Sequence, residues 1–216
     1  MHKAVHKVLS NKSLSSRTFK LSVERHGMEF RAGQCVNLGL PNTGINREYS
    51  SYSGEHDSDL SFLVREVEDG DVSPALRNLK YGDSIEIDGA YGLFTMPKTN
   101  KSVNSNVFIA TGTGIAPFHS FVRSYPNLDY FILHGTRLLE ENYESDHYSE
   151  KSYVHCVSKE RGGNFYGRVS DYLRLNPQGI DKKYYLCGNR NMLNEVYDIL
   201  REQNISGSNI MSEVFF

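Results

Sequence analysis

From Lys3 to about Phe94, hydrophobic and polar residues alternate in short runs separated by turn residues. The run around residue 20 is the clearest example, because Phe19, Leu21 and Val23 each alternate with a polar residue. A period of two is the pattern of a strand with one buried face. Further strands are predicted at 34–40, 48–53, 60–67 and 84–88, with one short helix at 74–79. So many short strands favour antiparallel pairing in a small closed or half-closed barrel.

The pattern changes after a stretch at 97–106, which is polar and therefore typical of an exposed connection between domains. Beyond it, apolar runs alternate with helical segments, at 107–110, 130–133, 153–157 and 184–187. This alternation predicts a parallel sheet in an α/β domain. The expected domains are a β-barrel domain at 1–97, a linker at 98–105 and an α/β domain at 106–216.

The last helix has the strongest pattern in the chain. Asn189 is placed to cap its start. Five apolar residues then recur with helical spacing, namely Met192, Leu193, Val196, Ile199 and Leu200. We expect this stripe to face the core of the α/β domain.

Charge and composition exclude several classes of partner. The chain of 216 residues has 24 Lys and Arg against 26 Asp and Glu, and its net charge of -2 gives no electrostatic reason to bind nucleic acid or an anionic membrane. The sequence shows neither a signal-peptide h-region nor an apolar stretch long enough to cross a bilayer. We therefore expect a soluble, cytoplasmic and monomeric protein without membrane insertion.

The cysteines limit the redox chemistry that this chain can hold. Cys35, Cys156 and Cys187 are odd in number and far apart, so they predict neither a disulfide framework nor a Cys-ligated iron-sulfur cluster. No metal site is expected. Any one-electron centre must then belong to a partner.

The turn after the run at 107–110 is glycine-rich. Gly112 and Gly114 let the backbone approach a pyrophosphate, and the amides that open the next helix supply donors and a positive dipole end. Pro117 stands where a Rossmann fingerprint would have a third glycine, and proline is well tolerated in a first helical turn. The alternative is a glycine-rich turn that binds nothing.

A second candidate phosphate site lies in the β half, at Gly70, Asp71, Val72 and Ser73. Ser73 is predicted as an N-cap and Pro74 as the first helical residue, so the free amides of a short helix could hold a phosphate. Such caps are common without any ligand.

Residues 47–50 favour the phosphate interpretation of this second site. Arg47 can bind a phosphate with two hydrogen bonds, Tyr49 offers a ring for stacking, and Ser50 offers a hydroxyl to a ring nitrogen. The alternative is an edge strand with a solvated arginine.

Taken in order, these motifs resemble the ferredoxin-NADP reductase superfamily over essentially the whole chain, and most closely its compact bacterial ferredoxin or flavodoxin reductases. The matching segments are Arg47-Glu48-Tyr49-Ser50, Gly70-Asp71-Val72-Ser73, 89–94, 111–118, 157–160, 167–169, 186–189 and 213–216. The resemblance implies an N-terminal Greek-key flavin barrel and a C-terminal α/β dinucleotide domain with five parallel strands. It also implies an oxidoreductase that uses both cofactors.

The resemblance assigns roles to residues of the first half. Arg47 would neutralise the flavin pyrophosphate, Tyr49 would pack on the isoalloxazine, and Ser50 would hydrogen-bond flavin N5. Glu48 lies within the same flavin-binding motif, and backbone groups around Val72 and Ser73 would complete the phosphate site.

The resemblance assigns roles in the second half as well. Thr113, between Gly112 and Gly114, would lie near both cofactors, and Cys187 would border the nicotinamide. Glu213 is the acidic residue that the family places near the flavin. Phe215 and Phe216 stand where the family often has tyrosine or tryptophan over the flavin, and a phenyl ring lacks the polar group of those residues.

The preference between NADPH and NADH depends on positive charge near the adenine ribose. Arg137, Lys159 beside Ser158, and Arg168 fall where the bacterial reductases gather cations around the 2'-phosphate. These cations favour NADPH, with NADH as the alternative. Lys159 replaces a more usual arginine, which keeps the charge but loses the planar bidentate contact.

The expected reaction is hydride transfer from NADPH to FAD, followed by single-electron transfer to a ferredoxin, a flavodoxin or a similar redox protein. FMN is the less favoured flavin. Three alternatives remain open: a free-flavin reductase, the reductase component of an oxygenase, and a dinucleotide-sensing module without turnover.

Overall fold

The computed structural model describes residues 2–97 and 106–215 and divides into two compact units. The first unit is formed by Met1–Met96 with Ala116–Pro126, and the second by Pro97–Ile115 with Asn127–Phe216. The predicted linker at 98–105 lies outside the described residues, as does Phe216. The segment at 116–126 groups with the first unit, whereas the predicted domain bounds assigned it to the second.

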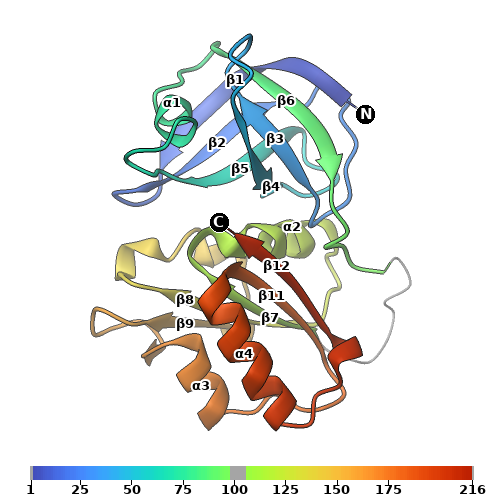
Figure 1. Ribbon diagram of the computed structural model, residues 1–216, viewed down its shortest axis with the longest axis vertical. Coiled ribbons are helices and arrows are strands. Elements are labelled where there is room, and N and C mark those ends of the chain that lie inside the picture. The colour runs from blue at the N-terminus through green and yellow to red at the C-terminus, as the bar shows by residue number, and fades with distance from the viewer. Residues whose placement is uncertain (1, 98–105, 216) are drawn as a thin grey trace. The chain divides into compact units, whose positions relative to one another are not determined.

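The first unit is built on a six-stranded antiparallel sheet in the order β4-β3-β6-β1-β2-β5 (Figure 1). Its elements are β1 (His2–Ser13), β2 (Thr18–Glu24), β3 (Cys35–Gly39), β4 (Asn46–Ser50), β5 (Asp59–Arg65), α1 (Ser73–Arg77) and β6 (Ser84–Tyr91). The two edge strands approach each other, because Ser51 forms an antiparallel bridge with Phe62 directly after β4. The Tyr52 amide then donates to the Ser61 carbonyl at 2.8 Å. The sheet therefore curls into a nearly closed barrel.

The core of this barrel follows from the alternating pattern of its strands. Phe19, Leu21 and Val23 of β2 are fully buried, as the period of two predicts. Their inward rings and branched chains pack with residues of β1, β5 and β6, and the ring of Tyr49 packs against the same cluster. Burial of these side chains is the main favourable term in the stability of the barrel.

The second unit contains a six-stranded parallel sheet in the order β10-β9-β8-β7-β11-β12 (Figure 1). Its main elements are β7 (Asn106–Thr111), the 3-10 helix η1 (Gly112–Ile115), β8 (Tyr130–Thr136), β9 (Tyr153–Val157), β10 (Phe165–Tyr166), α3 (Val169–Leu175), β11 (Lys183–Asn189), α4 (Arg190–Glu202) and β12 (Ile210–Phe215). Short 3-10 helices complete the connections, at Leu139–Glu141 (η2), Ser145–His147 (η3), Glu150–Ser152 (η4) and Gly207–Asn209 (η5). The family resemblance implied five parallel strands, and the two-residue β10 is the addition. The predicted fold class, a Greek-key barrel and an α/β parallel sheet, is confirmed.

Helices α3 and α4 cover the same face of the parallel sheet (Figure 1). All five residues of the predicted α4 stripe are buried. Asn189 caps the helix as predicted, since its side-chain oxygen accepts a hydrogen bond from the Met192 amide at 3.0 Å. The amphipathic pattern thus fixes which face of α4 lies on the sheet.

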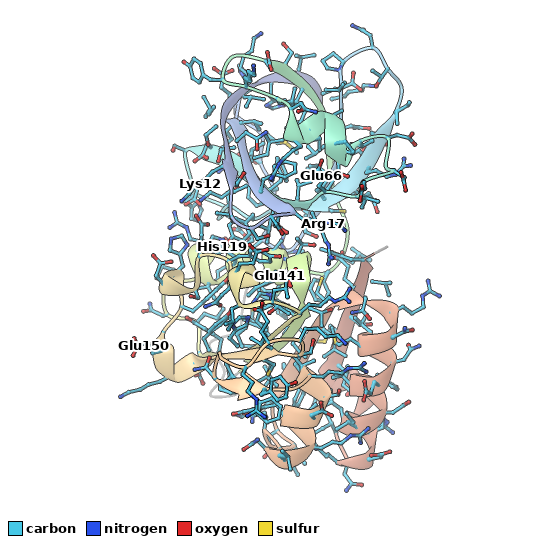
Figure 2. All side chains as sticks on the ribbon, turned by 90° about the vertical axis from the view of Figure 1, so that its left-hand side faces the viewer. Lys12, Arg17, Glu66, His119, Glu141 and Glu150 are labelled. Carbon is cyan, nitrogen blue, oxygen red and sulfur yellow. The ribbon has the colours of Figure 1, made fainter. Side chains whose placement is uncertain are left out.

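Helix α2 (Ala116–Ser124) packs in the first unit through buried polar contacts. His119, labelled in Figure 2, stacks on Tyr52 with ring centroids 3.7 Å apart, and its Nδ1 donates to the Tyr52 carbonyl at 2.6 Å. One residue further on, the Ser120 hydroxyl donates to the Ser53 carbonyl at 2.7 Å. These bonds explain why α2 groups with the barrel, although its sequence follows the glycine turn directly.

None of the helices in the described ranges combines the length and apolar character that a membrane-spanning helix requires.

Candidate nucleotide and flavin sites

The parallel sheet places the glycine turn at a topological switch point. The chain runs from β7 outward through β8 and β9, then returns to add β11 and β12 on the other side of β7. In open α/β sheets, ligands bind beyond the carboxyl ends of the strands at such a point. Thr111 ends β7 and Asn189 ends β11, and the two are joined because the Asn189 side-chain amide donates to Thr111 Oγ1 at 3.1 Å. The switch point is thus a defined edge built from two segments far apart in sequence.

Close backbone approach explains the glycines at this edge. A Cβ on Gly114 would overlap the Cys187 carbonyl, and a Cβ on Gly188 would overlap Thr111 Oγ1. Gly112 has a φ of +54°, which non-glycine residues rarely adopt. The turn is therefore specified by backbone geometry, as a site for phosphate binding through main-chain amides requires.

Cys187 lies inside this edge and is fully buried. Burial raises the pKa of its thiol well above the ordinary value, and the nearby Glu213 adds to the effect. The thiol therefore stays protonated at neutral pH and is no nucleophile. On β12, Glu213 is the register partner of Cys187, and Phe215 is the partner of Asn189.

A buried network that the sequence analysis missed supports the glycine turn. His134 on β8 has no exposed surface, and its Nε2 donates to the Gly112 carbonyl at 2.9 Å. Its Nδ1 lies 2.8 Å from the Tyr153 hydroxyl. Burial lowers the pKa of His134 to about 3, so the ring is neutral. The available signal was a histidine directly after the apolar run at 130–133, where β8 continues to Thr136.

The three predicted cations lie along one edge of the same unit. Arg137 follows β8, Lys159 follows β9, and Arg168 precedes α3, and all three side chains are exposed. The Lys159 amide donates to the Arg137 carbonyl at 3.0 Å, which holds the first two loops together. Ser158 donates from its hydroxyl to the Thr136 carbonyl at 3.1 Å. The backbone is fixed here while the cationic groups stay available.

A carboxylate organises the loop that carries Arg137. Glu141, labelled in Figure 2, is buried, and its Oε2 accepts from the amides of Arg137 and Leu138 at 2.9 and 3.0 Å. The carboxylate thereby satisfies two main-chain donors of the loop, while the Arg137 side chain is exposed. The available signal was a glutamate three residues after Leu138, at the N3 position of the 3-10 helix η2, where a carboxylate can accept from the N-cap amide.

In the barrel unit, Arg47 lies on β4 next to the second candidate phosphate segment. Its guanidinium is 3.7 Å from the Asp71 carboxylate, with 61% and 68% of the two side chains exposed. An exposed pair at this distance is weak and readily exchanged for a phosphate. Asp71 follows Gly70, so the structure brings together the two motifs that the sequence analysis linked to flavin phosphate.

The predicted start of the short helix is wrong by one residue. The helix α1 begins at Ser73, its N-cap is Val72, and no side chain caps it. Ser73 instead accepts a hydrogen bond from the Val67 amide at 2.9 Å, while Pro74 takes the second helical position. The serine therefore closes the preceding loop, because Val67 competes for its oxygen.

Burial increases along the rest of the β4 motif. Glu48 is exposed, Tyr49 is half-buried against the barrel core and Ser50 is buried. Burial raises the pKa of Tyr49 to about 12, against a smaller opposing effect of Arg47. Tyr49 is consequently a neutral, anchored ring at any physiological pH.

Comparisons with known proteins agree with this geometry. Residues 3–96 match the family described as oxidoreductase FAD-binding domain. The chain is 30% identical to the toluate 1,2-dioxygenase electron transfer component of Pseudomonas putida over 94% of its own length and 65% of that protein. It is 28% identical to a ferredoxin-NADP reductase of Pseudomonas aeruginosa, covering 96% and 92% of the two chains.

A solved structure has the same fold. The chain matches a ferredoxin NADP+ reductase from Neisseria gonorrhoeae with a TM-score of 0.90 at 23% identity, over 100% of both chains. Barrel, switch point and comparisons together define a two-unit, FAD-binding oxidoreductase. The chain is similar to ferredoxin-NADP reductases over most of its length, and its residues 3–96 match an FAD-binding oxidoreductase domain.

Proposed function

We propose that this protein takes a hydride from NADPH onto FAD and passes electrons singly to a ferredoxin, a flavodoxin or a similar redox protein. The observation that carries the proposal is the joint presence of a phosphate-accessible Arg47 on an FAD-binding barrel and a glycine turn at the switch point of a parallel sheet. Bound FAD supplies the chemistry that converts a two-electron donor to one-electron delivery. The residues of the chain bind and orient the two cofactors and shield them from water.

The barrel residues fit a flavin. Arg47 offers a guanidinium whose present partner, Asp71, is weakly held. Tyr49 offers a neutral ring that the core anchors, and the buried Ser50 offers a hydroxyl at the end of the same strand. We assign these residues to flavin phosphate, flavin ring and flavin N5 respectively.

The edge of the parallel sheet fits a dinucleotide. The turn at Gly112, Thr113 and Gly114 is proposed to hold the pyrophosphate through main-chain amides. Arg137, Lys159 and Arg168 are proposed to surround a 2'-phosphate, which supports NADPH over NADH.

Cys187 is proposed to border the nicotinamide, and Glu213 is proposed to lie near the flavin. The buried thiol remains protonated, so it adds no negative charge where a hydride would leave the nicotinamide. Glu213 is half-buried beside Cys187 and would supply a proton to the reduced flavin. The half-buried ring of Phe215 would cover a face of the flavin ring.

The proposed partner supplies the one-electron centre. The relative from P. aeruginosa is named for ferredoxin and NADP, which supports a small redox protein as acceptor. We propose a monomer that acts in the cytoplasm, where the three thiols at 35, 156 and 187, none of which is in a disulfide, would stay reduced.

Anaerobic titration of the FAD-loaded protein tests the main proposal. NADPH should bleach the flavin absorbance with one equivalent, and NADH should require a much higher concentration. If neither nucleotide bleaches bound flavin, the proposal fails. Gel filtration after FAD loading separates it from the free-flavin alternative, because a free-flavin reductase would lose its yellow colour on the column.

A second candidate function is the reductase component of an oxygenase. The identity to the toluate dioxygenase component favours it, although the chain spans only 65% of that protein's length. Reduction rates with a ferredoxin, a flavodoxin and an isolated oxygenase component as acceptors distinguish the two functions. If the oxygenase component is reduced about tenfold faster than the other acceptors or more, the second function is favoured.

A further inference from the structure

We propose that His134 and His155 are positioning residues for the dinucleotide, each for a different part of it. His134 sets the orientation of the pyrophosphate turn, and His155 sets the loop that carries Arg137. This inference rests on the proposed function, because it concerns how the same nucleotide site is held in shape.

His134 acts through one peptide group. Its Nε2 donates to the Gly112 carbonyl at 2.9 Å from the buried side of the turn. In a trans peptide, the carbonyl and the following N-H point in opposite directions. The hydrogen bond therefore directs the Thr113 amide away from His134 and outward from the sheet, where a main-chain donor can meet a phosphate. As a residue at the start of a helix, Thr113 has no intrahelical acceptor for that amide.

The protons of this network can be assigned. A neutral imidazole has one N-H, and the carbonyl of Gly112 can only accept, so that proton is on Nε2 and Nδ1 is the acceptor. The Tyr153 hydroxyl, 2.8 Å from Nδ1, is then the donor. The same hydroxyl also lies 2.6 Å from Asn142 Oδ1, but it has only one proton to give, and that proton goes to His134. The NH2 group of Asn142 should consequently face Tyr153, with its oxygen toward Ser145.

His155 acts on the neighbouring loop in the same way. It is buried, and its Nε2 lies 2.7 Å from Thr136 Oγ1. Because that hydroxyl donates its proton to the Leu138 carbonyl at 2.9 Å, it must accept from His155. The chain of bonds pins the backbone on both sides of Arg137, together with Glu141. The two histidine ring centroids lie 5.8 Å apart with 27° between the ring planes, so neighbouring imidazoles support both loops.

The two loops recognise different chemical groups, which makes the inference testable. NADPH and NADH share the pyrophosphate and differ only in the 2'-phosphate. Loss of His134 should weaken both nucleotides equally and leave their ratio unchanged. Loss of His155 should weaken NADPH selectively. A merely structural role would lower stability without separating these two effects.

The experiment uses FAD-loaded protein and isothermal titration with NADP+ and NAD+. We expect His134→Leu to weaken both by about tenfold, the effect of losing one well-placed hydrogen bond, with the NADP+ to NAD+ ratio kept within twofold. We expect His155→Leu to lower that ratio by about fivefold. His134→Gln and His155→Gln should each restore at least half of the lost affinity on a logarithmic scale, since an amide can both donate and accept.

Tyr153→Phe keeps the inference falsifiable if a leucine variant does not fold. It leaves the His134 ring in place but removes its donor, so both nucleotides should weaken together by about threefold. Nucleotide binding by the wild-type protein distinguishes a failure of the proposed function from a failure of the positioning roles. If wild type binds neither nucleotide, the proposed function fails; if wild type binds and the folded variants bind as tightly with an unchanged ratio, the positioning roles are overturned. A parallel loss in His155→Leu for both nucleotides would overturn the role of His155.

Discussion

The two predicted phosphate-binding regions are constructed in opposite ways. Around Arg47, recognition depends on a charged side chain that is 61% exposed and paired only weakly with Asp71. Around Gly112, it depends on backbone held from beneath by the fully buried His134. A site made of exposed charge can be altered without disturbing the fold, whereas a site made of packed backbone shares its contacts with the core. The predictions below test this contrast.

Substitution of Gly114 by alanine should have the largest effect. Its Cβ would overlap the Cys187 carbonyl, and both are backbone-fixed, so the ends of β7 and β11 must separate. We expect a loss of about 3 kcal/mol in the free energy of unfolding and nucleotide binding too weak to measure. Urea unfolding and NADP+ titration give the two quantities.

Gly207→Ala is the matched control for that substitution. A Cβ at Gly207 meets its nearest atom, the Tyr197 hydroxyl, at 3.6 Å, which is ordinary contact. Its stability and affinity should equal those of wild type. Equal behaviour of the two variants would show that the close approach at Gly114 does not matter.

Acid should destabilise the parallel-sheet unit through its buried histidines. Burial lowers the pKa of His134 to about 3 and also lowers that of His155, where Glu141 opposes the shift. In the unfolded chain, these histidines are protonated with a pKa of about 6.5. The stability that depends on their neutral rings is therefore present above that pH and is lost as the pH falls toward 3. From about pH 7.5 to 5, the contribution of His134 alone falls by about 2 kcal/mol.

His134→Gln removes that contribution and flattens the pH dependence. The measurement is the free energy of unfolding in urea at about pH 7.5, 6 and 5 for wild type and variant. The difference between them should shrink as pH falls. Parallel curves would mean that His134 is protonated in the folded protein, contrary to its burial.

Arg47→Ala should weaken FAD binding while leaving the fold intact. A hydrogen bond to a charged group contributes about 1.5–3 kcal/mol, so affinity should fall by about 10- to 100-fold. The free energy of unfolding without FAD should change by less than about 0.5 kcal/mol, because Arg47 is exposed. Arg65→Ala, an exposed arginine on β5, removes the same charge and should leave FAD affinity unchanged. If both variants lose the same FAD affinity, Arg47 contributes only through the net charge of the protein and not through direct contact with the phosphate.

The same contrast explains what could be predicted from the sequence. Strands with one buried face, the capped α4 and the motifs at Arg47 and Gly112 depend on local patterns, and the structure has them where expected. The error at Ser73 arose because the amide of Val67, six residues earlier in the preceding loop, takes the serine oxygen. Glu141 was missed although its contacts are also local, because its partners are the amides three and four residues before it. His134 was missed because its partner is the Gly112 carbonyl, 22 residues away, and no local spacing encodes such a tertiary contact.

The smallest effect is expected for Asp71→Asn, and it has the opposite sign to Arg47→Ala. The Asp71 carboxylate lies 3.7 Å from the Arg47 guanidinium. A flavin phosphate bound to Arg47 would compete with this carboxylate and would be repelled by its negative charge. Because an exposed pair contributes about 0–1 kcal/mol, removing the carboxylate should tighten FAD by about two- to fivefold without a change in stability. Asp69→Asn changes the net charge equally two residues away and should have no effect on FAD affinity. Fluorescence titration of FAD at low and high salt measures both variants, and the gain should decrease with salt. Weaker binding in Asp71→Asn would mean that the carboxylate orients Arg47 for the phosphate instead of competing with it.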